Sequence, residues 1–168
     1  MRSQLVKIVL AVTVVSSCGA CGTPKATAGD DLYVQGATVA IDRSARIYYS
    51  DNSALGTPVR LTVRDDQEWT RRWKQITRGS SVPPPQPEAT FDESMLLIVA
   101  GGRFLTPGDS VYIDSIRVQG DTLTALVRIY RQCSPFALTP TPVEVTQLPA
   151  WIGTVHFEDR EYSIEGCG

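Results

Sequence analysis

After residue 32 the chain is dominated by short runs in which every second residue is apolar. The clearest run takes every second position from Leu123 to Ile129. Because the side chains of a β-strand point alternately to its two faces, this spacing predicts strands with one buried face. Further strands are expected within residues 39–41, 46–49, 59–63, 95–100, 111–118, 143–148, 154–157 and 162–164.

Glycine, proline and short polar residues mark where these strands bend or turn. The alternation slips by one position at Asp114-Ser115, which predicts a β-bulge. Gly120-Asp121 matches a two-residue hairpin loop, and Glu158–Arg160 predicts a turn before the last strand. Ser80–Pro87 contains four prolines, so this segment is extended. We interpret it as a stiff connection rather than as a ligand for a partner's groove.

Residues 66–77 change to a helical period. Trp69, Trp73 and Ile76 are spaced four and three apart, which places both indoles on one helical face. Asp65 is suited to cap the first turn, with a glutamate three residues later. The two tryptophans would suit a binding platform or a core anchor, and we interpret them as core. One helix among many strands predicts an α+β class: a strand-rich domain with an antiparallel β-sheet and one amphipathic helix packed on it.

Residues 1–17 have the layout of a signal peptide. Arg2 and Lys7 supply positive charge, Ile8–Val15 is a short apolar run, and Ser16-Ser17 are small. A transmembrane helix needs about 20 apolar residues, which this run does not reach. We therefore expect a chain that is exported without spanning the membrane.

Cys18 follows this leader directly. A cysteine after an aliphatic-small-small triplet resembles the bacterial lipobox, in which the thiol is diacylated and becomes the new N-terminus. Residues 18–31 contain no large apolar side chain and predict a lipidated flexible tether with an r.m.s. reach of roughly 20 Å. The alternative is an ordinary signal peptide, cut between Ala20 and Cys21. We expect a lipid anchor at Cys18 and an extracytoplasmic location in the cell envelope, on its periplasmic or surface face.

Cys133 and Cys167 lie in residues 32–168, which we expect to form a single globular domain. In an oxidising compartment two such thiols are expected to form a disulfide. The bond would close a loop of 34 residues, counted from Cys133 to Cys167. Through the lost entropy of the unfolded chain it would stabilise the fold by about 3 to 4 kcal/mol. Two free thiols that bind a metal ion are the alternative.

The sequence argues against several classes of partner. Without Arg2 and Lys7 the 16 basic residues become 14, against 18 acidic ones. No nucleic-acid-binding motif, phosphate loop or dinucleotide fingerprint is present. An exported protein would also not meet nucleic acid in its compartment. We therefore expect no nucleic-acid partner and no cofactor.

His156 is the only histidine, so any Ser–His or Cys–His mechanism must use it. Ser110 is the one suggestive nucleophile, but no nucleophile elbow surrounds it. A zinc site normally takes several imidazoles or thiolates, which the chain lacks once its cysteines pair. Glu158, Asp159 and Glu161 do not have the spacing of a calcium loop. We expect no catalytic residue and no metal site.

Several loose motifs occur in a recognisable order: Asp65–Trp69 after a strand, Phe91–Leu97 after a proline-rich link, Gly101–Arg103, and Pro142–Val145. Across residues 40–160 this order resembles the C-terminal domain of PrcB-like proteins, lipoproteins associated with a bacterial surface protease complex. The resemblance implies a binding or stabilising role and brings no catalytic residue. Thr106–Val111 stands where that family commonly has a Gly-Gly-Tyr-type turn, so the identity of the partner does not carry over.

Three functions follow as hypotheses. The first is a non-catalytic extracytoplasmic lipoprotein that binds or stabilises an envelope protein, such as a protease. The second is an envelope module for a small molecule or glycan, which would need an open cleft with Tyr48, Tyr49 or Trp151 exposed. The third is a hydrolase that uses His156.

Overall fold

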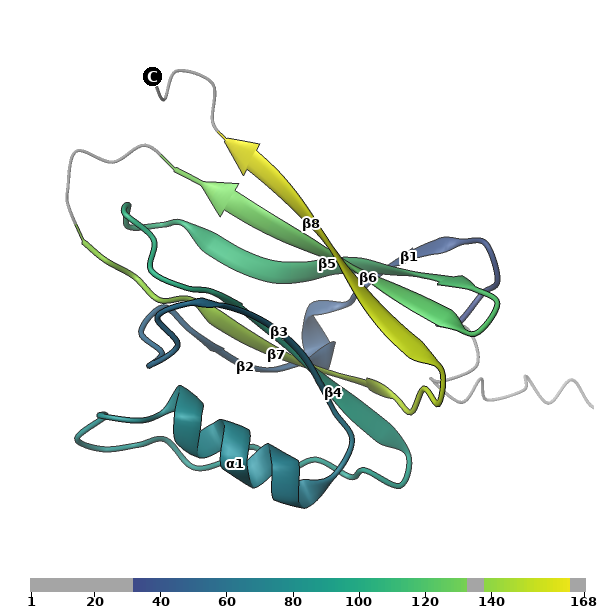
Figure 1. The fold of residues 1–168 in the computed structure, drawn as a ribbon, viewed down its shortest axis with the longest axis horizontal. Helices are drawn as coiled ribbons and strands as arrows, with labels where there is room; N and C mark the ends of the chain where they lie inside the picture. Colours follow the sequence, from purple (N-terminus) through teal and green to yellow (C-terminus); the bar gives the residue numbers. More distant parts are fainter. Residues whose placement is uncertain (1–31, 133–137, 164–168) are drawn as a thin grey trace, which may run out of the picture.

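The computed structural model describes residues 32–132 and 138–163, which form two β-sheets and one α-helix in three layers (Figure 1). We name the sheets A and B. Sheet B lies between sheet A and the helix, and each interface is filled by its own hydrophobic core. The α+β class expected from the sequence is confirmed, with the strands divided between two sheets.

Sheet A has the strand order β1-β5-β6-β8, and sheet B has the order β2-β7-β4-β3. The strands of sheet A are β1 Thr38–Ala40, β5 Ser110–Gln119, β6 Thr122–Arg131 and β8 Thr154–Ser163. Those of sheet B are β2 Arg46–Ser50, β7 Val143–Pro149, β4 Ser94–Gly101 and β3 Pro58–Val63. The helix α1 spans Asp66–Ile76, and a short 3-10 helix, η1, spans Arg43–Ala45.

The strand β4 is buried along its whole length because it packs on both sides. Met95, Leu97 and Val99 belong to the core between the two sheets. Leu96 and Ile98 belong to the core between sheet B and α1. A strand covered on both faces reads as a continuous apolar run, which explains why its sequence does not alternate.

The predicted irregularities of sheet A are present. The pairing of β5 with β6 shifts register between Ile113 and Ser115, where the sequence predicted a bulge. The two strands join through the two-residue loop Gly120-Asp121, and Gly120 has φ 62°, a left-handed value that favours glycine.

The strand β8 corrects two expectations. Glu158–Arg160 was expected to turn, but Thr154–Ser163 is one strand that pairs with β6 along its whole length. Charged side chains suit this strand because it lies at the sheet edge, where such residues discourage further pairing. The pairing with β6 is parallel, whereas the other five strand pairs of the described residues are antiparallel, as expected. The reason is that β7, which lies between β6 and β8 in the chain, belongs to the other sheet.

The helix α1 forms as the sequence predicted. The Asp65 carboxylate accepts a hydrogen bond from the backbone N–H of Glu68, at 2.7 Å. The Glu68 side chain pairs with Arg72 instead of completing the capping box. Trp69 and Trp73 are 1% and 6% exposed, so both indoles belong to the core. In the described ranges, no helix has the length and apolar character needed to cross a membrane.

The ends of β6 and β8 lie side by side, since Arg131 is opposite Ser163 in the parallel register. A disulfide between Cys133 and Cys167 requires this neighbourhood of the two strand ends. Both cysteines lie outside the described residues, so the disulfide stays a prediction. Cys18 and the tether lie outside them as well.

Candidate functional site

A polar cavity of about 520 Å³ opens at one edge of the sandwich, between β5 of sheet A and β2 and β7 of sheet B. We call it the edge pocket. Its lining comes from four places: Ala40–Arg43, the β2 residues Arg46 and Tyr49, the β5 residues Ser110 and Tyr112–Asp114, and the β7 residues Glu144 and Thr146.

The edge pocket exists because β1 is only three residues long. It pairs with Ser115–Arg117 of β5, and one more hydrogen bond joins the Ile41 N–H to the Asp114 carbonyl. The chain then crosses to sheet B through η1. Within the described chain, no strand pairs with Ser110–Ile113 on this side of β5.

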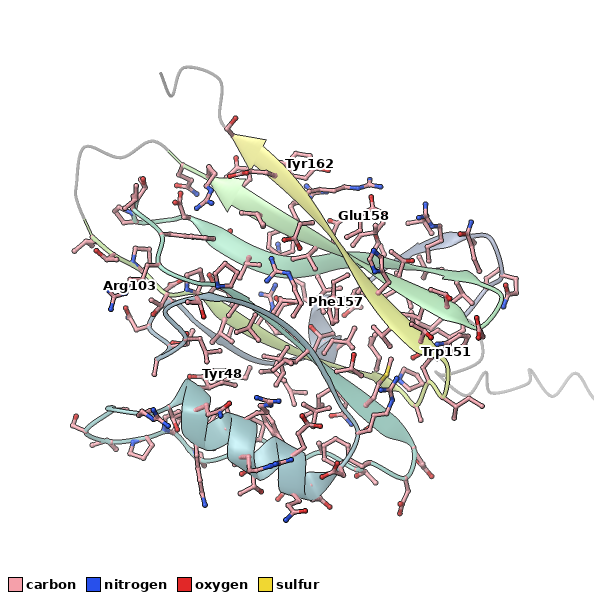
Figure 2. The ribbon with its side chains drawn as sticks, in the orientation of Figure 1. Tyr48, Arg103, Trp151, Phe157, Glu158 and Tyr162 are labelled. Atoms are coloured by element: carbon pink, nitrogen blue, oxygen red, sulfur yellow. The ribbon has the colours of Figure 1, made fainter. Side chains whose placement is uncertain are left out.

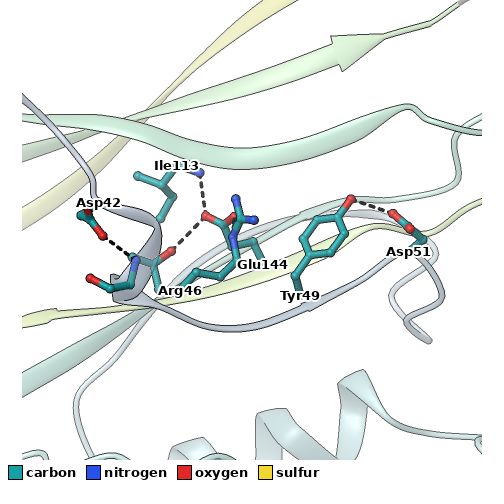
Figure 3. Close-up of polar contacts among 8 residues, drawn as sticks. Asp42, Arg46, Tyr49, Asp51, Ile113 and Glu144 are labelled. Atoms are coloured by element: carbon teal, nitrogen blue, oxygen red, sulfur yellow. Dashed lines mark hydrogen bonds and ion pairs between the residues drawn. The ribbon is translucent and has the colours of Figure 1, made fainter.

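Glu144 compensates for the missing strand. One of its carboxylate oxygens accepts hydrogen bonds from the Ile113 N–H, at 2.9 Å, and from the Thr146 hydroxyl, at 3.0 Å. The other oxygen lies 2.5 Å from Nε of Arg46 in an ion pair (Figure 3). The Glu144 side chain is 2% exposed and that of Arg46 is 32% exposed. Glu144 therefore occupies the place at which a neighbouring strand would offer a backbone carbonyl to Ile113.

Burial raises the pKa of the Glu144 carboxyl above its ordinary value of 4.5. The Ile113 N–H, the Arg46 guanidinium and the Thr146 hydroxyl oppose this shift without cancelling it. The Glu144 carboxylate already binds the Ile113 N–H, the Thr146 hydroxyl and the Arg46 guanidinium, so its interactions stabilise the fold. We therefore assign Glu144 a structural role at the wall of the edge pocket.

Tyr49 forms the neighbouring part of the wall. Its hydroxyl donates a hydrogen bond of 2.6 Å to Asp51, and the Arg46 guanidinium lies 5.3 Å from its ring centroid (Figure 3). Burial and the Asp51 carboxylate raise the pKa of Tyr49, so the phenol stays protonated. Arg43 is exposed at the rim of the same pocket.

The outer face of sheet A is the second candidate site. Helix α1 covers the outer face of sheet B, whereas no described element covers that of sheet A (Figure 1). From the strand register, its large side chains are Tyr112 and Arg117 of β5, Arg128 and Tyr130 of β6, and His156, Glu158, Arg160 and Tyr162 of β8. We call this set the open face.

Ion pairs and aromatic contacts hold the side chains of the open face in place. Arg128 pairs with Asp114 at 3.0 Å, and its guanidinium lies 4.5 Å from the ring centroid of Tyr162. Glu158 lies 2.9 Å from Arg160 and 3.5 Å from Arg117. Figure 2 shows Glu158 and Tyr162 on β8. Tyr112 belongs to the open face and also lines the edge pocket, as does Asp114, the partner of Arg128, so the two sites adjoin.

The structure separates the two residues that a serine hydrolase would need. His156 is exposed on β8, opposite Thr124. Ser110 begins β5, where it is opposite Tyr130, and Tyr130 is opposite Tyr162. Six residues along β8 separate His156 from Tyr162, which amounts to roughly 20 Å. His156 therefore cannot act as the base for Ser110.

The acidic residues of β8 do not gather around a common point. Glu158 pairs with Arg160 and Arg117, Asp159 with Arg60, and Glu161 with Arg131. Among residues 32–132 and 138–163, no three His, Cys, Asp or Glu side chains lie close enough together to bind a metal ion.

The three aromatic residues considered for a ligand cleft occupy three separate places. Tyr48 packs edge-on against Trp73, with ring centroids 4.7 Å apart, in the core under α1. Tyr49 lines the edge pocket, and Trp151 packs against Tyr33 at the end of the sandwich where the described chain begins. They form no shared binding platform.

Sequence reasoning did not find the edge pocket. The available signal was Glu144, an acidic residue that falls on the same face of the predicted strand as the apolar Leu148. The length of β1, which opens the pocket, has no comparable signal.

Comparison with protein-family models, with curated proteins and with solved structures found no match to this chain.

Proposed function

We propose that the protein is a non-catalytic, extracytoplasmic lipoprotein that binds or stabilises another protein of the cell envelope. The observation that supports this best is the open face of sheet A, which no described element covers. Tyrosine and arginine are enriched at protein interfaces, and both types are abundant on this face.

Side chains of the open face are already held in place before a partner binds, and this favours binding. Arg128 is fixed between Asp114 and the rings of Tyr112 and Tyr162, so a partner need not immobilise it. Less side-chain entropy is then lost on association. Leu126 is 4% exposed although it lies on the outer face, where Glu158 is its register partner. The stems of long charged side chains can cover an apolar residue in this way. The face is thus polar at its surface and apolar at its base.

A protease is the partner class that the PrcB-like resemblance favours. The support comes from the order of motifs in residues 40–160 and concerns the class of partner only.

Affinity capture tests the proposal. The full-length protein would be recovered with its partner from detergent-solubilised envelopes, and the complex would be titrated. Tyr162, which is 39% exposed, is replaced by alanine. We expect Tyr162→Ala to weaken binding roughly tenfold, about 1.4 kcal/mol, without changing the melting temperature.

Val82→Ala is the matched control, because Val82 is also exposed but lies in the proline-rich segment beside α1. It should leave the affinity unchanged. Equal binding by wild type and Tyr162→Ala, or recovery of no envelope protein with the wild type, would count against the proposal.

The anchor has its own test. Cells that produce the full-length chain are labelled with palmitate. We expect Cys18→Ala to lose the label and Cys21→Ala to keep it. Label that persists in Cys18→Ala would mean that the leader has been misinterpreted.

A small-molecule module is the second candidate, and the edge pocket favours it. Its volume of about 520 Å³ lies within the range of roughly 300–1,000 Å³ that is usual for ligand sites. Thermal-shift measurements with envelope sugars and peptidoglycan fragments would test this function. A ligand that stabilises the wild type but not Arg43→Ala would favour it.

A further inference from the structure

One end of the sandwich gathers apolar side chains at its surface. Ile152, in the loop between β7 and β8, is 103% exposed, and Val34 is 48% exposed. Trp151, which is labelled in Figure 2, is half-buried. It lies against the ring of Tyr33, with ring centroids 5.2 Å apart. Leu32 completes the group. Leu32, Tyr33 and Trp151 are half-buried and also pack against the core between the sheets, so Val34 and Ile152 are the exposed members. We call these five residues the apolar end.

Hydrogen bonds hold the backbone of the apolar end in place. The Tyr33 hydroxyl donates to the Pro149 carbonyl, which fixes the first described segment to the end of β7. The Trp151 indole N–H donates to the Thr154 carbonyl, and Arg64 donates to the Trp151 and Gly153 carbonyls. The loop backbone is therefore held while the Ile152 side chain points into solvent.

The predicted tether joins the domain at the apolar end, which indicates that this surface lies near the membrane. The apolar end contains Leu32, and only 13 residues, 19–31, separate Leu32 from Cys18. A flexible chain of this length has an r.m.s. reach of roughly 20 Å. With Cys18 acylated, a tether of this reach would keep Leu32 within roughly 20 Å of the lipid.

We propose that the apolar end docks on the membrane, with Trp151 and Ile152 in contact with the lipid interface. The inference rests on the lipid anchor of the proposed function and adds a fixed orientation to it. Tryptophan favours the membrane–water interface, and exposed aliphatic side chains lose their contact with water there. Asp121 adjoins this end through the hydrogen bond from Thr154 N–H to its carbonyl, and Arg64 adjoins it through the Trp151 and Gly153 carbonyls. These two charges are opposite in sign, so we expect the contact to be apolar rather than electrostatic.

Docking sets the direction in which the open face points. β8 starts at Thr154, beside the apolar end, and runs through ten residues to Ser163. Its length is roughly 30 Å. Tyr162 is therefore presented to a partner well above the lipid surface, whereas His156 lies close to it.

The test uses the full-length acylated protein in phosphatidylcholine vesicles with brominated acyl chains. Trp69 and Trp73 are buried, so Trp151 is the indole within reach of the bromine quencher. We expect quenching of the emission in the wild type, its loss in Trp151→Phe and a reduction in Ile152→Ser. Salt should not reverse the quenching.

Leu105→Ser is the matched control, since Leu105 is 81% exposed. It follows Gly101 at one end of β4, whereas Pro149 is paired with Ser94 at the other end, roughly 23 Å away. This variant should keep the quenching of the wild type.

Three results would overturn the proposal, and they are distinguishable. Acylated protein that binds the vesicles without quenching contradicts docking and leaves the anchor in place. A chain that carries no acyl group removes the premise of both. Ile152→Ser that loses partner capture but keeps quenching would assign the apolar end to a protein partner instead.

Discussion

At the scale of single residues, Glu144 explains how an unpaired strand edge is tolerated inside the sandwich. Its carboxylate accepts a hydrogen bond from the Ile113 N–H, which would have bound a longer β1, and Arg46 balances its charge. The alternation in residues 143–148 was enough to predict the strand. It did not predict these partners, because they come from two other strands whose edges are visible only in the fold.

The raised pKa of Glu144 predicts how stability depends on pH. The folded state binds this proton more tightly than the unfolded chain, in which the pKa is near 4.5. The resulting stability is present below that pH and is lost as the pH rises through the folded-state pKa. Glu144→Gln cannot lose a proton there. Urea unfolding should therefore show that, from about pH 4 to about pH 8, the free energy of unfolding of Glu144→Gln rises relative to that of the wild type.

Glu88→Gln is the control for this pH series, because Glu88 is exposed. The free energy of unfolding of Glu88→Gln should not rise relative to that of the wild type over the same pH range. If the Glu144→Gln difference stayed flat or moved towards the wild type, the ion pair with Arg46 rather than burial would control the titration.

At the scale of elements, the helix and the strands differ in how far the sequence determines them. The helix depends on local features, a cap at Asp65 and two indoles four residues apart, and both were visible in the sequence. The bulge at Asp114 was visible as a slip in phase. Glu158–Arg160 was predicted to be a turn, because three consecutive charged residues interrupt the apolar alternation expected of a half-buried strand. The side chains that neutralise this run, such as Arg60 and Arg117, come from β3 and β5.

Removing one indole from α1 should destabilise the whole domain. Trp73 is 6% exposed and packs against Tyr48 and Trp69. Trp73→Ala should lower the free energy of unfolding by about 3–5 kcal/mol, because the cavity cannot fully collapse. Urea unfolding checks this, with the exposed neighbour Lys74→Ala as the control. Equal stability of the two variants would contradict the core assignment.

At the scale of the whole molecule, the order of the strands joins parts that are distant in the sequence. The parallel pair of β6 and β8 was not predictable from periodicity, because the period of a strand says nothing about which strand it pairs with. The pairing bears on the predicted disulfide between Cys133 and Cys167. Arg131 and Ser163 are opposite each other, two residues before Cys133 and four before Cys167.

This neighbourhood predicts a disulfide with a measurable contribution. In a Cys21→Ser background, the oxidised protein should show no thiol that reacts with a maleimide after unfolding. Cys133→Ser and Cys167→Ser should each cost about 3 to 4 kcal/mol. The double variant should cost no more than either single one, since one bond is lost in each case. Two reactive thiols in the oxidised protein would contradict the pairing.

The central claim is that the open face of sheet A binds an envelope protein, and site-specific photo-crosslinking in living cells tests it most directly. A photoreactive phenylalanine analogue replaces Tyr162 on the open face or Lys74 on the exposed side of α1, both of which are exposed. We expect the envelope protein recovered by affinity capture to crosslink from position 162 and not from position 74. Crosslinks from position 74 with none from position 162 would contradict the claim.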